Sequence, residues 1–205
     1  MNLSTREHWE KVYRGKRPDE VSWYQENPKT SLDFIHALNP AHDSRIIDVG
    51  GGESRLIDAL LAEGFTDLTV LDISEGAIGR AKARLGAQAE RVKWIVSDVI
   101  EFEPERPYDI WHDRATFHFL TDQALIERYV GLVGSGVRKG GHLILATFST
   151  SGPKSCSGLP VHQYSEDALS DSLRGGFEKV RCITEDHITP SGASQNFLFC
   201  IFRRL

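Results

Sequence analysis

Short apolar segments rich in Val, Ile and Leu alternate along the chain with longer segments in which apolar residues recur every three or four positions. Short apolar runs bounded by polar residues and glycine predict buried β-strands. The predicted strands are Arg45–Val49, Asp67–Asp72, Val92–Ser97, Tyr108–His112, His142–Phe148, Arg181–His187 and Asn196–Arg203. Pro190 and Gly192 indicate a hairpin turn between the last two.

The segments between the first five strands predict helices, at Ser54–Glu63, Ser74–Leu85 and Thr121–Val133. Ser74 is a favourable N-cap residue, and Gly86 follows the helix that it would begin. An alternation of strands and helices is typical of a parallel sheet covered by helices on both faces. We therefore predict an α/β fold with an open, twisted, mostly parallel sheet.

The chain is predicted to form a single domain over residues 1–205, because no long linker or internal repeat interrupts it. Residues 1–40 form an N-terminal helical and aromatic segment, and 41–148 form the core. Residues 149–205 hold a substrate-side loop and the closing strands. The stretch 149–164 is rich in Ser, Gly and Pro, which predicts a loop. It leaves the carboxyl end of the fifth strand, the edge at which open α/β sheets bind ligands.

The net charge, the apolar runs and the cysteines limit the partners and the cell compartment that we expect for this protein. The net charge of −5 disfavours nucleic acid as the main partner, since phosphate binding favours a basic surface. No apolar run is long enough to span a bilayer, and the charged N-terminus has no signal-peptide pattern. Three cysteines, Cys156, Cys182 and Cys200, are widely spaced, which suits a reducing cytoplasm and predicts neither a disulfide nor a zinc site. We expect a cytoplasmic protein without membrane contact.

The sequence RIIDVGGGESRLIDAL carries the strongest local signal. Asp48 ends a predicted strand, and the glycines at 50, 51 and 52 precede a helix. Glycines there allow a tight turn and close approach of a ligand to the backbone. A dinucleotide fingerprint would need a glycine where Arg55 stands, which disfavours a nicotinamide-dependent oxidoreductase. The next strand ends in Asp72, at the spacing where Rossmann-type folds hold ribose hydroxyls.

The order and spacing of HWEKVYRG, VSWYQ, IIDVGGGES, VLDIS, VSDV and YDIWHDRATFHFL resemble class I, Rossmann-like S-adenosylmethionine-dependent methyltransferases, a group that includes lysine methyltransferases of elongation factors and of citrate synthase. The resemblance implies seven strands with an antiparallel last strand, and S-adenosylmethionine as cofactor. The cofactor residues that it implies are Trp9, Tyr13, Trp23, Asp48, Gly50, Gly52, Ser54, Asp72, Ile73, Asp98, Val99 and Arg114. In this family Asp98 and Val99 meet the adenine, and the three aromatic residues cover the cofactor.

The aromatic residues admit a second interpretation. Trp9 and Tyr13 share one face of a helix, so they can simply be packing residues of the core. A cofactor lid would instead let aromatic faces stabilise the sulfonium by cation–π attraction. Both alternatives stay open from the sequence, with Trp23 the strongest candidate for the lid.

Methyl transfer from a sulfonium is a direct displacement that requires alignment and, for some acceptors, removal of a proton. His112 and Asp113, with His118 nearby, are candidate groups for that work, and the competing interpretation is a structural role. No metal-ligand spacing is present, and an arsenite-type acceptor at Cys156 is disfavoured because several thiols would have to converge. We predict methylation of a small molecule or a protein side chain. A cofactor-binding regulator without catalysis is the alternative.

Overall fold

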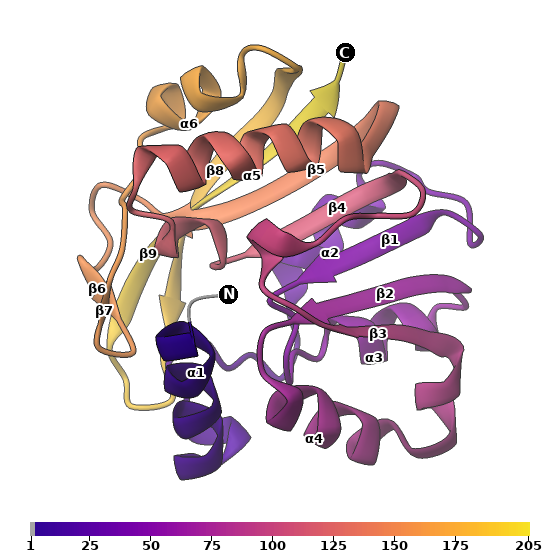
Figure 1. Ribbon diagram of the computed structural model, residues 1–205, viewed down its shortest axis with the longest axis vertical. Coiled ribbons are helices and arrows are strands. Elements are labelled where there is room, and N and C mark those ends of the chain that lie inside the picture. Colours follow the sequence, from indigo (N-terminus) through magenta and orange to yellow (C-terminus); the bar gives the residue numbers. More distant parts are fainter. Residues whose placement is uncertain (1–2) are drawn as a thin grey trace.

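The computed structural model describes residues 3–205. Its main sheet has the strand order β3-β2-β1-β4-β5-β9-β8 (Figure 1). These strands are β1 (Arg45–Val49), β2 (Asp67–Asp72), β3 (Val92–Val96), β4 (Tyr108–Arg114), β5 (Val137–Phe148), β8 (Phe177–Ile188) and β9 (Ser194–Arg204). Strands β1 to β5 run parallel, and β9 runs antiparallel to both β5 and β8. The predicted α/β fold with an antiparallel last strand is confirmed.

Strands β4, β5, β8 and β9 are longer than the sequence predicts, and the largest extensions are at the starts of β5 and β8. Strand β5 begins at Val137 instead of His142, and it continues through Gly140, whose φ of +73° only glycine adopts without cost. Its pairing with β4 shifts register between Tyr108 and Ile110. The glycines therefore accommodate an irregularity inside the strand. Strand β8 begins at Phe177 instead of Arg181, also with a register shift.

Helices cover both faces of the sheet (Figure 1). They are α1 (Leu3–Gly15), α2 (Lys29–His36), α3 (Leu56–Ala62), α4 (Glu75–Leu85), α5 (Gln123–Gly136) and α6 (Glu166–Leu173). Apolar residues of α5 and α6 pack on one face, and those of α2 and α3 pack on the other. Adjacent strand residues alternate between these two cores, as Ile46 and Ile47 do in β1, because side chains of a strand point to opposite faces. The predicted cap is present at α4, where Ser74 Oγ accepts from the Ala77 amide at 3.1 Å.

One helix and one short hairpin were not predicted. Helix α6 begins after Ser165, whose hydroxyl accepts from the Ala168 amide, and it buries Leu169 and Leu173 one turn apart. The loop over 149–164 holds the short hairpin β6 (Ser155–Cys156) and β7 (Leu159–Pro160). Figure 1 shows this hairpin and α1 at the end of the molecule where β1 and β2 terminate. The substrate-side loop and the N-terminal helix thus approach the same edge of the sheet.

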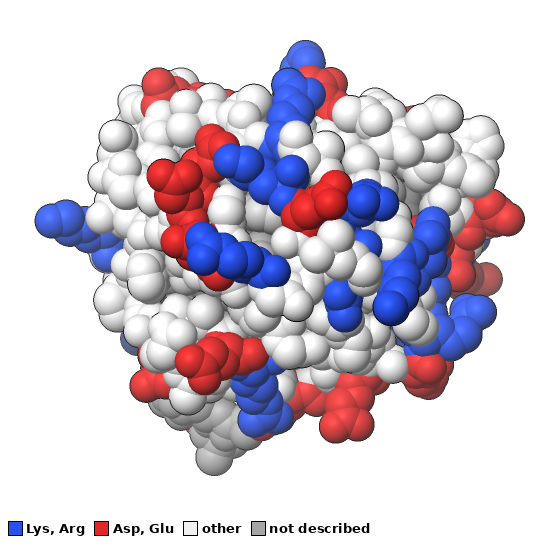
Figure 2. Space-filling view, turned by 90° about the horizontal axis from the view of Figure 1, so that it is seen from above, with Lys and Arg blue, Asp and Glu red and all other residues white. Residues whose placement is uncertain are grey.

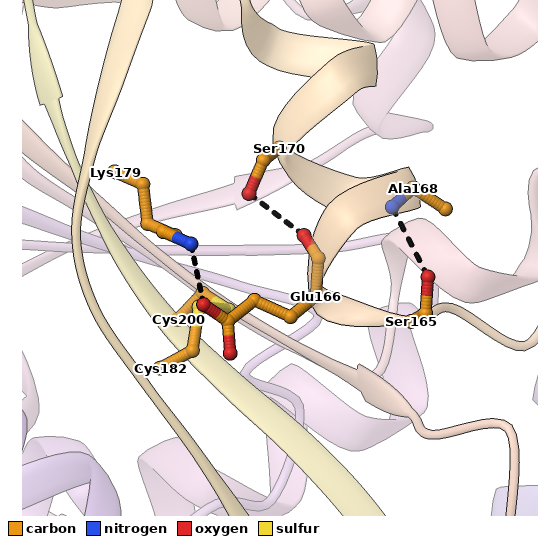
Figure 3. The surroundings of a disulfide bond; sticks show 7 residues. All are labelled: Ser165, Glu166, Ala168, Ser170, Lys179, Cys182 and Cys200. Atoms are coloured by element: carbon orange, nitrogen blue, oxygen red, sulfur yellow. Dashed lines mark hydrogen bonds and ion pairs between the residues drawn. A yellow bond between two sulfur atoms is a disulfide. The ribbon is translucent and has the colours of Figure 1, made fainter.

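The structure overturns the prediction of no disulfide. Cys182 and Cys200 are bonded, and they are directly opposite residues of the antiparallel pair β8 and β9 (Figure 3). Nearby, Lys179 of β8 forms an ion pair with Glu166 at the start of α6. The sequence separation of the two cysteines did not reveal the pairing, because only the strand register places their Cβ atoms side by side. Cys156 is free and buried.

This arrangement predicts the number of reactive thiols. When the chain is unfolded without reductant, we expect one thiol to react with a colorimetric disulfide reagent, since only Cys156 is free. Unfolding after reduction should expose all three cysteines of the chain. Mass spectrometry of the alkylated, unreduced protein gives the assignment. Three reactive thiols without reductant would show that Cys182 and Cys200 are not bonded.

Charges of both signs are mixed on the face of the molecule shown in Figure 2. Lys and Arg side chains alternate there with Asp and Glu, and no continuous basic surface forms on this face. Among residues 3–205, no helix is long and apolar enough to cross a membrane. The same residues contain no group of three or more His, Cys, Asp or Glu side chains that could hold a metal ion.

Candidate active site

A cavity of about 360 Å³ lies at the carboxyl ends of the parallel strands, beneath α1. One half, the cofactor half, is lined from the ends of β1, β2 and β3 by Gly50, Leu71, Asp72, Ile73, Ser97, Asp98, Val99, Ile100 and Glu101. The other half, the acceptor half, is lined by Phe119, Phe148, Cys156, Gln195 and Phe197, from β5, β9 and the loops beside them. Trp9, Tyr13, Trp23 and Arg114 also line it. A smaller adjoining cavity is bordered by Asp48, Gly50, Ser54, Arg55 and His112.

The glycine loop turns between β1 and α3 in a conformation that side chains would block. Gly50 has a φ of +67°, and a Cβ placed on it would lie 1.9 Å from Thr116 Oγ1. Gly52 has a φ of +43°, and a Cβ there would lie 2.7 Å from Tyr13 Oη. Gly52 lies between Tyr13 and Asp72 and lines neither cavity. Ser54 Oγ accepts from the Leu56 amide at 3.0 Å and so fixes the turn that leads into α3.

Substitution of Gly50 tests this close packing. We expect Gly50→Ala to reduce the free energy of unfolding by about 1–3 kcal/mol more than Gly64→Ala does. The reason is that the new methyl group at position 50 collides with Thr116, whereas the one at position 64 meets no other atom. Gly64 is the matched control, with a φ of +92° and open space around its Cβ position. Denaturant unfolding of the two variants provides the comparison. Equal losses would mean that backbone strain alone explains the glycine at position 50.

Asp72 ends β2 with its carboxylate at the cavity. Its Oδ1 accepts from the Ser74 amide at 2.8 Å, and the Gly52 amide also bonds to it. Burial, with a further contribution from Asp48, raises the pKa of Asp72 to about 7. Asp98 occupies the equivalent end of β3, where it accepts from the Ile100 amide at 3.2 Å. The two acids therefore line the cofactor half from neighbouring strands, as their positions in the sequence predict.

The N-terminal aromatic residues pack against one another over the cavity. The ring of Trp9 lies 5.8 Å from Trp23 and 5.1 Å from Phe119, and Tyr13 lies 6.0 Å from Trp23. Arg80 of α4 holds this segment down, since its guanidinium stands over the Tyr13 ring and donates to the Tyr13 carbonyl. Both interpretations of the aromatics thus have support, because these residues pack together and also line the cavity.

Arg114 lies at the end of β4 and lines both cavities. Its Nη1 donates to the Trp23 carbonyl at 3.1 Å, and Cζ lies 4.9 Å from the centroid of the Phe197 ring. Nε and Nη2 are buried and have no partner. Burial lowers the pKa of Arg114 to about 10. The following residue, Ala115, has a φ of +71°, which is unusual outside glycine and turns the chain sharply at the cavity.

Of the candidate catalytic residues, Asp113 lines neither cavity, and its carboxylate is engaged within the protein. Its Oδ1 accepts from the Thr116 and Phe117 amides at 2.8 and 3.3 Å, and Tyr129 Oη donates to Oδ2 at 2.6 Å. Burial raises the pKa of Asp113 to about 6. These bonds fix the turn after β4, so Asp113 positions the residues that follow it.

The two histidines are also buried within the protein. His112 bonds through Nδ1 to Asp48 Oδ1 at 2.7 Å and through Nε2 to Ser31 Oγ at 2.9 Å. It borders only the smaller cavity, with both ring nitrogens engaged. His118 lines neither cavity, and burial lowers its pKa to about 3. The geometry therefore favours the structural interpretation for both.

Most of the acceptor half escaped the sequence analysis. Phe148 and Phe197 are directly paired residues of β5 and β9, and their rings lie 4.8 Å apart. Gln195 follows the β8–β9 turn, and Phe119 follows β4. Their convergence depends on the pairing of β5 with β9, for which the sequence has no local signal. The loop over 149–164 was placed correctly at this edge, and Cys156 is the residue by which it reaches the cavity.

Residues 47–143 match the family model of a methyltransferase domain. This part of the chain is therefore similar to methyltransferase domains. The matched range includes the glycine loop and the strand-end acids Asp72 and Asp98.

Two relatives and one solved structure are similar to this chain. The eEF1A lysine and N-terminal methyltransferase of Mus musculus is 24% identical over 67% of this chain, which spans only 20% of that relative. The EEF1A lysine methyltransferase 2 of Danio rerio is 21% identical over 95% of this chain and 84% of its own. A Burkholderia thailandensis 1,6-didemethyltoxoflavin-N1-methyltransferase with bound S-adenosylhomocysteine superposes with a TM-score of 0.75, at 20% identity over 98% of this chain and 87% of its own.

Proposed function

We propose that this chain is a methyltransferase that transfers the methyl group of S-adenosylmethionine to a small molecule or a protein side chain. The observation that carries the proposal is the cavity lined by the glycine loop and by acids at the ends of two successive strands, Asp72 and Asp98. Named relatives that are methyltransferases add support. Charge-assisted hydrogen bonds from ribose hydroxyls to a carboxylate are strong, which suits Asp72.

The described residues fit the cofactor at several points. Asp48 borders the smaller cavity, and its buried Oδ2 has no partner, which suits the ammonium of a methionine group. Asp72 with Ile73 would meet the ribose, and Asp98 with Val99 would meet the adenine. Gly50, Gly52 and Ser54 would shape the loop beside the amino-acid end. The main chain at Arg114 would adjoin the same end, from the tip of β4.

The aromatic residues would cover the bound cofactor. When S-adenosylmethionine is bound, it supplies an electrophilic methyl group on a sulfonium. Trp9, Tyr13 and Trp23 would exclude water from the cavity and present aromatic faces to that positive charge. The substrate-side loop and the closing strands, within residues 149–205, would supply Cys156, Gln195 and Phe197 of the acceptor half. A cytoplasmic location is part of the proposal and has to accommodate the disulfide in the closing strands, since cytoplasmic disulfides are rare.

Binding of S-adenosylhomocysteine tests the proposal directly. We expect calorimetry to detect one site, and the ligand to stabilise the protein by about 2.7 kcal/mol at a hundred times its dissociation constant. Nicotinamide dinucleotides serve as the control, because Arg55 replaces the glycine that a pyrophosphate site needs. Tight dinucleotide binding without S-adenosylhomocysteine binding would overturn the assignment. Turnover in cell extract with methyl-labelled cofactor separates an enzyme from a cofactor-binding regulator.

A further inference from the structure

The two halves of the cavity differ in charge. All carboxylates among its lining residues, Asp72, Asp98 and Glu101, belong to the cofactor half. The lining residues of the acceptor half include no Asp, Glu or His. The charged side chain that this half does receive is Arg114. A reaction in this half therefore takes place beside a cation, and none of the residues that line it is a carboxylate or a histidine.

The guanidinium of Arg114 extends from the end of β4 toward the acceptor half. The ring beneath it, Phe197, belongs to β9, which is separated from β4 by β5. The side chain thus points away from β1, β2 and β3, whose ends carry the acids of the cofactor half. The hydrogen bond to the Trp23 carbonyl fixes this direction and leaves Nε and Nη2 unpaired.

A buried guanidinium without a carboxylate partner is costly. Arg114 forms no ion pair with any residue of the part of the chain that the structure describes, and Glu185 and Asp48 act on it only at longer range. Its pKa of about 10 keeps it charged at neutral pH. Uncompensated buried charges are rare unless a ligand completes them. The Nε–H and Nη2–H groups of Arg114 lie in one fixed plane. They can donate to the two oxygens of a carboxylate or together to one anionic atom such as a thiolate sulfur.

The other residues of the acceptor half suit a ligand that is mostly apolar and carries one polar group. Phe148, Phe197 and Phe119 form its walls. Gln195 is buried, and its Oε1 lacks a partner, so its amide can also meet a polar ligand group. Cys156 is buried at the same wall, and burial raises the pKa of its thiol, which keeps it neutral there.

We propose that the methyl acceptor is a small anionic molecule with an aromatic or apolar body, whose thiolate or carboxylate is held by Arg114. The inference rests on the proposed function and names its substrate class. A lone pair of the anionic sulfur or oxygen forms the new bond to the methyl carbon. The bond from that carbon to the sulfonium sulfur breaks, and its electron pair stays on sulfur. The products are S-adenosylhomocysteine and a neutral thioether or ester, and no proton has to be removed.

A lysine side chain fits this half poorly. Its ammonium must lose a proton before it can attack, and no lining carboxylate or histidine is present there to accept one. The Arg114 guanidinium would also repel the ammonium. The acceptor inferred here therefore differs from the lysine named for the eEF1A relatives.

Four probes that share one ring system and differ in charge test the inference. They are naphthoate, naphthalenethiolate, neutral naphthamide and naphthylmethylammonium. Their binding is measured by calorimetry with the full chain saturated with S-adenosylhomocysteine. We expect the two anions to bind about tenfold or more tightly than the amide, and the ammonium to bind weakest. Naphthalenethiolate should then accept label from methyl-labelled S-adenosylmethionine. Anions that bind no better than the amide or the ammonium would overturn the inference.

Variants of Arg114 assign the preference to the guanidinium. Arg114→Gln should remove the preference for anions, and Arg114→Lys should restore part of it. The preference is the ratio of the dissociation constants of naphthamide and naphthoate, measured with each variant saturated with S-adenosylhomocysteine, so a change in cofactor affinity through the Trp23 contact does not alter it. An Arg114→Gln protein that keeps the wild-type ratio would show that another group holds the anion, which contradicts the inference. Failure of the wild-type chain to bind S-adenosylhomocysteine would instead reject the proposed function, and the inference with it.

Discussion

Asp72→Asn should weaken S-adenosylhomocysteine binding by about ten- to hundredfold, because the ribose would lose charge-assisted hydrogen bonds to the carboxylate. The substitution keeps the shape of the side chain and an acceptor for the Ser74 amide. Calorimetry at pH 8 measures the effect. Asp67→Asn is the matched control, since Asp67 begins the same strand and is 40% exposed at the opposite end. A folded Asp72→Asn protein with unchanged affinity would exclude Asp72 from the cofactor site.

The same substitution should change the pH dependence of stability without ligand. The pKa of Asp72 is raised from 3.8 to about 7 in the folded protein, so the folded state binds the proton more tightly than the unfolded state. The free energy of unfolding therefore falls as pH rises between those two values, by up to about 1.4 kcal/mol per pH unit from this group. Asp72→Asn should lack this contribution. Asp113 contributes in the same direction, and comparison of the two proteins cancels its effect.

Stability measurements from pH 4 to pH 8 provide the comparison. We expect the difference in stability between Asp72→Asn and wild type to shift in favour of the variant as pH rises. Wild-type affinity for S-adenosylhomocysteine should increase through the same range, because the ionised carboxylate is the stronger acceptor. A pH-independent difference in stability would show that burial does not raise the pKa of Asp72. In that case the ionised Asp72 carboxylate would not lower the stability of the protein without ligand.

The core of the fold could be predicted because its signals are local. Strands β1 and β2 begin and end where the sequence predicts, since each is an apolar run bounded by polar residues. The glycine loop follows β1 directly and Asp72 ends β2, so their placement at one edge required only a parallel sheet. Helix α6 was missed although its signal is also local, in the N-cap Ser165 and the paired Leu169 and Leu173.

The acceptor half and the disulfide could not be predicted in the same way. Phe148 meets Phe197, and Cys182 meets Cys200, through the register of antiparallel strands that are distant in sequence. A shift of one residue would place each side chain on the opposite face of the sheet. For His112 and Asp113, the residue types suggested chemistry, and only the partners seen in the structure reveal their positioning roles.

Removal of residues 1–24 should weaken S-adenosylhomocysteine binding on the order of a hundredfold, because three aromatic side chains that line the cavity would be lost. The deletion should leave the sheet folded. Tyr13 and Val21 of this segment are buried, but neither belongs to the two hydrophobic clusters that cover the sheet, and Trp23 packs at the margin of one. Circular dichroism and thermal unfolding report the fold, and calorimetry reports the affinity. A truncated chain that does not fold would show that the segment is part of the core.

Single substitutions separate a cofactor lid from core packing even if the truncated chain is unstable. Trp23→Ala should weaken cofactor binding more than it lowers the melting temperature without ligand, since its carbonyl can still accept from Arg114. Trp94→Ala is the matched control, because Trp94 of β3 packs against a hydrophobic core and lines neither cavity. It should lower the melting temperature and leave the affinity intact. If Trp23→Ala behaves as Trp94→Ala does, Trp23 stabilises the fold, and the cofactor is covered by other residues.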